Sequence, residues 1–314
     1  MKLALQLVTY NGAEYLPYLF SSLISQKDRD WTLYIIDNAS TERDRIRRVV
    51  HEAQKELPVV YLETDENLGF AGGHQKLFTM HDADLVQLIN PDVILTPDYL
   101  AKMRAFMEVN ETTGSAAGNI YRWDWEEGEP GLSNVIDSLG ITESRHGSIS
   151  DRGAGELKID PAISLLGVSG CLPMYRREAV EESSMNRELF DVRYHTYKED
   201  VDLAFRLKRA DWEVGIVSDA MAHHRREVRK GTKREHISYT SQFHSFRNHW
   251  WNLLTHTSSE DMVKRGWAIL LYELAKTVYL MLMHPSIVFR TVKETYEYFP
   301  VIKKKRSWYG TRTR

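Results

Sequence analysis

The stretch from Asp84 to Asp92, Asp-Leu-Val-Gln-Leu-Ile-Asn-Pro-Asp, constrains the fold of this chain more than any other. Its apolar residues lie between Asp84 and Pro91, a pattern typical of a buried strand. Proline cannot donate a hydrogen bond to a sheet, so we expect the strand to end there, with Asp92 at its carboxyl end. In open α/β sheets, ligands bind at that end of the strands. Asp92 is therefore either a ligand-binding carboxylate or a turn residue after a proline.

The chain before this stretch alternates between strand-like and helix-like patterns. Residues 3–8, 33–36 and 59–62 are strand-like, residues 16–24 and 46–57 have helical spacing, and a glycine-rich turn from Asn67 opens a third helix. Ser40 or Thr41 is the expected N-cap of the second helix. Strands that alternate with helices predict an α/β fold, a mostly parallel sheet with helices on both faces.

The remainder divides into an irregular section, more α/β pattern and a helical tail. We expect a helix over residues 97–109, an inserted loop or hairpin at 121–161, order again from 163, a helix from Glu199 and a last strand at 214–217. The pattern after residue 236 is helical and rich in aromatic residues. We therefore predict an α/β domain over residues 1–231 and a C-terminal helical appendage over 232–314.

Composition excludes several classes of protein. Cys171 is the only cysteine, so no internal disulfide can form, and the net charge of −3 gives no general attraction to nucleic acid. The first residues are too short an apolar run for a signal peptide. The most apolar segment, 267–289, contains Glu273, Lys276, His284 and Pro285 and is a poor membrane span. We expect a cytoplasmic protein.

Three groups of residues could carry chemistry. Asp37 follows a predicted strand, where a carboxylate can accept hydrogen bonds from a base or ribose, or cap a turn. Glu199 and Asp200 begin a predicted helix; acids are favoured there in any case, but a carboxylate at that place could also act as a general base. His223 and His224 follow the last strand and could complete a metal site with Asp92. Arg225 and Arg226, beside them, suit a diphosphate or a solvated basic loop.

These pieces, taken in order, resemble the inverting family 2 glycosyltransferases with the GT-A fold, and in particular their bacterial rhamnosyltransferase-like branch. The resemblance covers roughly residues 3–226. It is carried by Val8-Thr9-Tyr10-Asn11, Ile36-Asp37-Asn38-Ala39-Ser40-Thr41, Asn67-Leu68-Gly69-Phe70-Ala71-Gly72-Gly73, Asn90-Pro91-Asp92, Ser169-Gly170-Cys171, Glu199-Asp200-Val201-Asp202-Leu203 and His223-His224.

The resemblance implies a role for each matching residue. The nucleotide-sugar donor would contact Thr9, Tyr10, Asn11, Asp37, Asn67, Gly69, Phe70, Asn90 and Asp92. Asp92 and His224 would bind Mg²⁺ or Mn²⁺, Asp200 would be the catalytic base with Glu199 assisting it, and Ser169, Gly170 and Cys171 would line the acceptor side. Arg225, Arg226 and Arg247 are the candidates for the diphosphate.

Two departures from the family pattern bear on the donor. The family often has Gly-Gly-Asn-Asn where this chain has Gly72-Gly73-His74-Gln75, and a small Gly-rich loop where this chain has Arg225-Arg226-Glu227 after His224. A third departure bears on the metal: Asn90 replaces the first acid of the usual metal motif, which leaves Asp92 as the main carboxylate ligand. The branch resemblance favours dTDP-rhamnose, with UDP-hexoses or UDP-N-acetylhexosamines next. The implied acceptor is a hydroxyl of a cell-surface glycan or of a lipid-linked saccharide, in polysaccharide biosynthesis at the cell envelope.

The aromatic and basic tail allows two interpretations. Its amphipathic helices suit peripheral contact with the inner face of the plasma membrane, or Leu270, Leu274, Val278 and Leu282 pack on the catalytic domain or in a homodimer. For the whole chain, the alternatives to a transferase are a catalytically silent glycan- or nucleotide-sugar-binding scaffold and, last, a nucleotidylyltransferase.

Overall fold

The computed structural model of the protein describes residues 1–157, 164–226 and 237–310. Its first part alternates strands and helices as the sequence predicts. The elements are β1 (Leu3–Thr9), α1 (Leu16–Ile24), β2 (Trp31–Asp37), α2 (Arg43–Ala53), β3 (Val59–Glu63), α3 (Gly69–Phe78) and β4 (Leu85–Ile89). One detail differs from expectation: the N-cap of α2 is Glu42, because Ser40 lies in the preceding loop, where its hydroxyl accepts a hydrogen bond from the Asn11 N–H.

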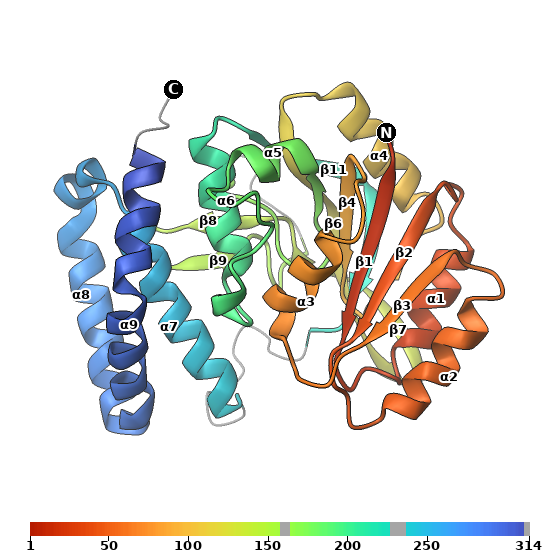
Figure 1. The fold of residues 1–314 in the computed structure, drawn as a ribbon, viewed down its shortest axis with the longest axis horizontal. Coiled ribbons are helices and arrows are strands. Elements are labelled where there is room, and N and C mark those ends of the chain that lie inside the picture. Colours follow the sequence, from red (N-terminus) through yellow and green to blue (C-terminus); the bar gives the residue numbers. More distant parts are fainter. Residues whose placement is uncertain (158–163, 227–236, 311–314) are drawn as a thin grey trace.

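The second part adds further strands of very different lengths, three more α-helices and a 3₁₀ helix. Its elements are β5 (Val93–Leu95), α4 (Tyr99–Val109), β6 (Thr113–Glu126), β7 (Glu129–Ser138), β8 (Ile141–Glu143), β9 (Ile149–Asp151), β10 (Met174–Arg176), α5 (Arg177–Glu182), the 3₁₀ helix η1 (Val192–Tyr194), α6 (Glu199–Arg209) and β11 (Glu213–His224). The long helices α7 (Tyr239–His256), α8 (Ser259–Met283) and α9 (Pro285–Gly310) follow. Figure 1 places these three helices together on one side of the molecule.

The main sheet is mixed rather than mostly parallel. Its strand order is β3-β2-β1-β4-β10-β6-β11-β5, and β7 pairs with β6 at the side. Strands β1 to β4 are parallel, but β10 runs antiparallel to both of its neighbours, and β5 runs antiparallel to β11. The parallel part brings the carboxyl ends of β1, β2 and β4 to one edge, as the positions of Thr9, Asp37 and Asn90 require.

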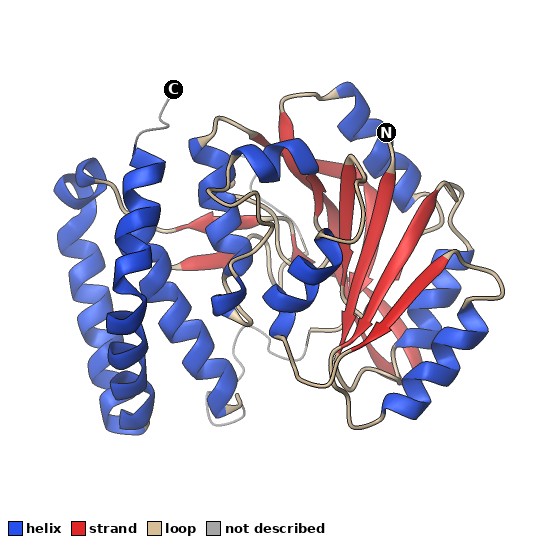
Figure 2. Cartoon of the chain, in the orientation of Figure 1, coloured by secondary structure: helices blue, strands red, loops and turns tan. Residues whose placement is uncertain are grey.

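Helices cover both faces of the sheet, each over its own core (Figure 2). Alternate residues of β4 serve the two cores: Leu85 and Ile89 pack with α1, α2 and α4, whereas Val86 and Leu88 pack with α3, α5 and α6. The second core also takes in Trp251 of α7 and Tyr298 of α9. The C-terminal helices are therefore packed against the α/β part. The predicted boundary at residue 231 lies outside the described residues.

The section from residue 113 differs most from the sequence prediction. Strand β6 lies inside the sheet and begins before the predicted insertion, and β6 and β7 form a hairpin. The sequence hides this strand because its first half consists of small residues with low strand propensity. Close packing explains why these residues are small, since a Cβ atom on Gly118 would lie 2.3 Å from the Ala220 carbonyl oxygen.

Candidate active site

The ends of β1 and β2 place Thr9 and Asp37 side by side. The two residues are partners in the parallel register, and both are buried. One oxygen of Asp37 accepts a hydrogen bond from the Ser40 N–H, and the other lies 3.7 Å from Nε of Arg43. Within the described residues, that second oxygen and the Thr9 hydroxyl make no hydrogen bond. Buried polar atoms without a partner are costly unless a ligand satisfies them, so this pair can receive polar groups of a ligand.

The neighbouring predicted donor residues mostly hold the loops in place. The Asn11 side-chain oxygen accepts hydrogen bonds from the backbone and the hydroxyl of Thr41, and the Asn67 side-chain oxygen accepts from the Gly69 N–H and from Asn38. Phe70 packs edge-on against His74. Tyr10 is 52% exposed at the same edge. Tyr10 can therefore contact a ligand directly, whereas the contacts of Asn11, Asn67 and Phe70 hold the loops around the ligand in place.

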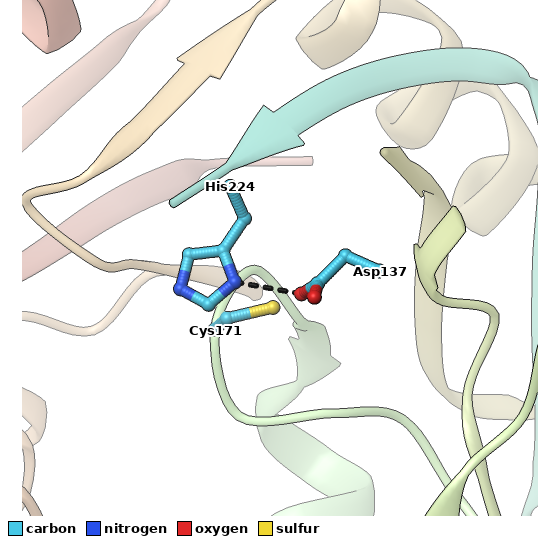
Figure 3. Close-up of side chains that lie close together, drawn as sticks. All are labelled: Asp137, Cys171 and His224. Atoms are coloured by element: carbon cyan, nitrogen blue, oxygen red, sulfur yellow. Dashed lines mark hydrogen bonds and ion pairs between the residues drawn. The ribbon is translucent and has the colours of Figure 1, made fainter. Parts of the chain in front are cut away.

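Asp92 and His224 come together at the end of β4 and β11. Nε2 of His224 lies 3.4 Å from a carboxylate oxygen of Asp92, and Nδ1 of the same ring lies 2.8 Å from Asp137 on β7 (Figure 3). Although burial opposes the charged form, the carboxylates of Asp92 and Asp137 raise the pKa of His224 well above its ordinary value. Asp137 was not predicted from the sequence, because the section that contains it was assigned to an insertion. His223 is the less suitable ligand, since it packs beside the ring of Tyr121 instead.

The donor atoms at this place fit a divalent cation. Asp137, Cys171 and His224 each offer one ligand atom within 4.8 Å of the others. A cation held here would take Nε2 of His224 and Asp92 as ligands rather than Asp137, because Asp137 already accepts from Nδ1 and lies 2.9 Å from the Arg226 guanidinium. Burial also raises the pKa of the Cys171 thiol to about 11, which disfavours the thiolate. Asp137 would then be the carboxylate that orients the His224 imidazole towards a bound metal.

The two acids at the start of α6 have different surroundings. The Asp200 carboxylate accepts hydrogen bonds from the N–H groups of Gly170 and Val201, at 2.9 and 2.8 Å. Glu199 is more deeply buried, and one of its oxygens has no hydrogen-bond partner in the part of the chain that the structure describes. Burial raises the pKa of both residues, and the charge of Asp200 raises that of Glu199 further. Glu199 therefore holds a proton more readily, which leaves Asp200 the better base.

The loop of Ser169, Gly170 and Cys171 connects the two carboxylate groups. Gly170 binds Asp200 through its N–H, and the Cys171 carbonyl accepts a hydrogen bond from the Asn90 N–H. A Cβ atom on Gly170 would lie 3.3 Å from the Asp200 carboxylate. The predicted acceptor loop thus links the proposed base to the strand end that carries Asp92.

The three arginines predicted for the diphosphate have protein partners. Arg225 donates to the Tyr15 hydroxyl and lies 3.4 Å from Asp124, and Arg226 pairs with Asp137 and Asp151. Both lie at the edge of the site, because the Arg225 N–H donates to the Asp92 carbonyl.

Arg247 is not brought to this edge. It is buried on α7, where its guanidinium pairs with Glu294 and donates to the carbonyl groups of Arg193 and Tyr194. Those contacts give it a structural task within the helical part.

An aromatic group beside Asp92 was also missed from the sequence. The Trp123 indole donates to the Asp92 carbonyl, Trp125 stacks on Tyr15, and the Arg225 guanidinium lies over the Tyr15 ring. The signal available in the sequence was the pair of tryptophans that alternates with charged residues, a pattern of a strand with one ring-lined face.

Comparison with known proteins gives one family and one fold. Residues 6–183 match the family described as glycosyl transferase family 2. A curated relative, an N-acetylglucosaminyltransferase of Azorhizobium caulinodans, is 21% identical over 201 residues. The match covers 61% of this chain and 46% of that protein, so the chain spans less than half the length of the relative.

Three solved structures with a similar fold are distant in sequence. S. aureus TarS residues 1–349 in complex with UDP-GlcNAc has a TM-score of 0.54 at 13% identity, over 95% of this chain and 73% of that one. GalNAc-T7 with UDP, GalNAc and Mn²⁺ has a TM-score of 0.62 at 12% identity, over 81% and 48%. The mannosyltransferase PcManGT of Pyrobaculum calidifontis with GDP-Man and Mn²⁺ has a TM-score of 0.53 at 14% identity, over 98% and 87%. This likeness confirms the predicted GT-A fold.

Proposed function

The chain belongs to glycosyl transferase family 2, and from this premise we propose that it is an inverting glycosyltransferase that uses a nucleotide-diphosphate sugar. One observation supports the proposal above all others. The loop at residues 169–171 ties the base candidate Asp200 to the strand end that carries Asp92 and faces His224. A base for the acceptor and a metal-binding pair for the donor diphosphate therefore lie on the two sides of one short loop.

The donor would lie along the carboxyl edge of the sheet. Thr9 and Asp37 offer the nucleoside buried oxygen atoms that have no hydrogen-bond partner among the described residues, and Asp92 and His224 would hold Mg²⁺ or Mn²⁺ next to the diphosphate. That cation, when bound, offsets the negative charge that develops on the leaving group. Asn90 makes no charge contribution, so Asp92 would be the principal carboxylate ligand.

Asp200 would accept the proton of the acceptor hydroxyl. As the hydroxyl oxygen forms its bond to the anomeric carbon, the bond from that carbon to the diphosphate breaks, and the electron pair leaves with the nucleoside diphosphate. Attack from the face opposite the diphosphate inverts the anomeric carbon. The hydrogen bonds from Gly170 and Val201 fix the direction of the Asp200 carboxylate and leave each oxygen a second lone pair for the proton.

The donor we favour is dTDP-L-rhamnose, on the resemblance to the rhamnosyltransferase-like branch. A UDP-N-acetylhexosamine or UDP-hexose is the second candidate, since the curated relative is named an N-acetylglucosaminyltransferase and TarS was solved with UDP-GlcNAc. The acceptor would be a hydroxyl of a cell-surface glycan or lipid-linked saccharide, made at the inner face of the plasma membrane.

Binding of sugar nucleotides tests this proposal first. Thermal shift is measured with dTDP-rhamnose, UDP-GlcNAc, UDP-glucose and GDP-mannose, each with and without Mn²⁺. A ligand at a hundredfold excess over its Kd stabilises the folded state by roughly 2.7 kcal/mol, so the true donor should stand out. A metal-dependent shift with dTDP-rhamnose supports the donor, and a UDP-sugar that shifts more replaces it.

Hydrolysis of the bound donor separates an enzyme from a silent scaffold. We expect slow release of nucleoside diphosphate by the wild type and a lower rate for Asp200→Asn. Equal background rates in both proteins, together with donor binding, would favour the scaffold.

A further inference from the structure

The outer face of α8 is apolar along most of its length. Every residue from 267 to 283 that the structure leaves exposed is apolar or aromatic, and the exposed fraction reaches 68% for Leu270 and 79% for Leu282. At 1.5 Å per residue this face is about 24 Å long. We call it the α8 face, and its most exposed members are Trp267, Leu270, Leu271, Leu274, Leu282 and Met283.

Charged side chains in this part of α8 turn towards the protein. Glu273 accepts hydrogen bonds from His249 and Trp250 of α7, and the Lys276 ammonium lies over the Phe246 ring of the same helix. In Figure 1, α8 lies at the outer edge of the molecule, away from the sheet. Of the two interpretations of the tail, packing of Leu270, Leu274, Val278 and Leu282 on the catalytic domain is therefore excluded, whereas a dimer contact and a membrane contact both stay open. Soluble monomers rarely leave an apolar patch of this extent in water.

We propose that the α8 face docks the protein on a lipid bilayer that carries anionic headgroups. The charges on the neighbouring helix α9 favour a bilayer, rather than a second copy of the chain, as the partner of the α8 face. The exposed charged residues of α9 are Arg290, Lys293, Lys303, Lys304 and Arg306 on the basic side and Glu297 on the acidic side. Basic residues beside an apolar helix face attract anionic lipid, whereas a two-fold contact through this face would bring like charges together.

A groove opens on the same surface. A cavity of about 1080 Å³ lies between α7 and α8, and Ala275, Tyr279 and Met283 belong both to its lining and to the α8 face. A smaller cavity of about 200 Å³ shares Lys276 with it and reaches Tyr197, three residues before Asp200. The two cavities thus extend from the α8 face to the segment that precedes the proposed base at the start of α6. This last step alone rests on the proposed function.

Among the described helices, α8 is the one with the length and composition of a membrane span, a test that buried helices of other proteins also pass. Its contacts with α7 through Glu273 favour docking by one face over insertion. Protease protection distinguishes the two arrangements, because a docked protein stays wholly accessible from outside the vesicle.

Co-sedimentation with vesicles tests the docking without any use of activity. The full chain is mixed with vesicles of phosphatidylcholine alone or with 30 mol% phosphatidylglycerol (about a third anionic lipid). We expect binding to the anionic vesicles, weakened at least tenfold by the double substitution Leu270→Glu and Leu274→Glu and reduced by high salt. The control is Val109→Glu, which places a single glutamate at an 81% exposed apolar residue of α4 and should bind like the wild type; Leu270→Glu alone, which adds the same charge, should bind more weakly than this control.

The opposite results overturn the proposal. The first is that the wild type does not sediment with either kind of vesicle. The second is that the wild type binds no vesicles and forms a dimer in solution that the double substitution dissociates. Donor binding by thermal shift confirms that each variant is folded. Loss of donor binding in the wild type would count against the proposed function and leave the docking result intact.

Discussion

Nδ1 of His224 lies 2.8 Å from the carboxylate of Asp137, a residue of another strand 87 positions earlier in the chain. The ring is thereby fixed with Nε2 towards Asp92, at 3.4 Å. A histidine that binds metal is usually oriented in this way by a hydrogen bond at its other nitrogen. Asp137 is fully buried and also pairs with Arg226, so its position is set by its surroundings before any ligand arrives.

Substitution of Asp137 should weaken metal binding, although Asp137 itself is not a proposed ligand of the metal. We expect Asp137→Ala to lower Mn²⁺ affinity by about 10- to 100-fold, since the imidazole loses its orientation. Asp137→Asn, which keeps an acceptor for Nδ1–H, should have a smaller effect. Mn²⁺ binding is measured directly by electron paramagnetic resonance on the folded protein. Asp82→Asn, a substitution at an exposed carboxylate, is the control. Equal affinity in Asp137→Ala and wild type would remove Asp137 from the site.

Asp200 should matter for turnover and little for donor binding. As the proposed base it contacts the acceptor side, so Asp200→Asn should lower kcat by about 10²- to 10⁴-fold while the thermal shift with donor stays the same. The raised pKa of Asp200 also predicts that activity falls with decreasing pH at a higher pH than an ordinary aspartate would give. Loss of donor binding in Asp200→Asn would instead give the residue a place on the donor side.

Glu199 should make the folded state less stable as the pH rises. Its pKa is raised in the folded state, so the folded state binds the proton more tightly than the unfolded chain. Stability is then lost as the pH rises above the ordinary glutamate range towards the folded pKa. Glu199→Gln should therefore have a higher Tm than the wild type at pH 8 and a similar Tm at pH 4. A Tm difference that does not grow with pH would show that Glu199 is not buried with an uncompensated charge.

The sequence predicted the parallel part of the fold because its patterns are regular there. Strands such as β4 are continuous apolar runs, and α1 buries Leu16, Leu19 and Leu23 at helical spacing. It did not predict β6, whose small residues are selected by close contacts such as that of Gly118 with Tyr99. Such a contact joins positions far apart in the chain, and no local pattern records it.

The same distinction separates the predicted from the missed site residues. Asp37 and Asp92 lie at or just after strands that a local pattern reveals, so their convergence could be expected from the topology. The strand predicted at 214–217 is longer in the structure, where β11 runs from Glu213 to His224 and carries the histidine itself. Asp137 also follows two apolar residues, but the sequence does not show that Asp137 lies beside His224. That contact is found only when β7 is placed beside β6 in the sheet. Arg247 was assigned by residue type, and its contacts with Glu294 are set by the packing of α7 on α9.

Lys305 anchors the helical tail to the α/β part. It is 2% exposed and lies 2.7 Å from Asp191, whose pKa it lowers to about 2 against the effect of burial. Lys305→Met leaves the Asp191 carboxylate with Arg193 as its remaining cationic partner, so the substitution should cost about 1.5–3 kcal/mol in urea unfolding. Lys304→Met, at the exposed neighbouring position, should have little effect.

The pH dependence of that pair gives a second measurement. A depressed carboxyl pKa stabilises the folded state above the unfolded pKa, and the stabilisation is lost as the pH falls from about 4 towards 2. The stability difference between wild type and Lys305→Met should therefore shrink over that interval. A difference that is constant with pH would assign the effect to packing of the lysine stem.

Gly69 and Gly128 offer a matched test of the loop beside the donor edge. Both have positive φ, +70° and +89°, so alanine costs about 1–2 kcal/mol of backbone strain at either position. At Gly128 a Cβ atom meets nothing within 4 Å, but at Gly69 it would lie 2.3 Å from the His195 carbonyl oxygen. That oxygen accepts the Ala71 N–H at the first turn of α3.

Gly69→Ala must therefore displace the loop around His195 as well, and we expect this variant to lose about 2 kcal/mol more stability than Gly128→Ala in urea unfolding. The displaced loop leads directly into Glu199 and Asp200, so turnover should fall with Gly69→Ala and stay unchanged with Gly128→Ala. Equal losses of stability in the two variants would mean that the Gly69 loop does not contact the His195 loop in solution.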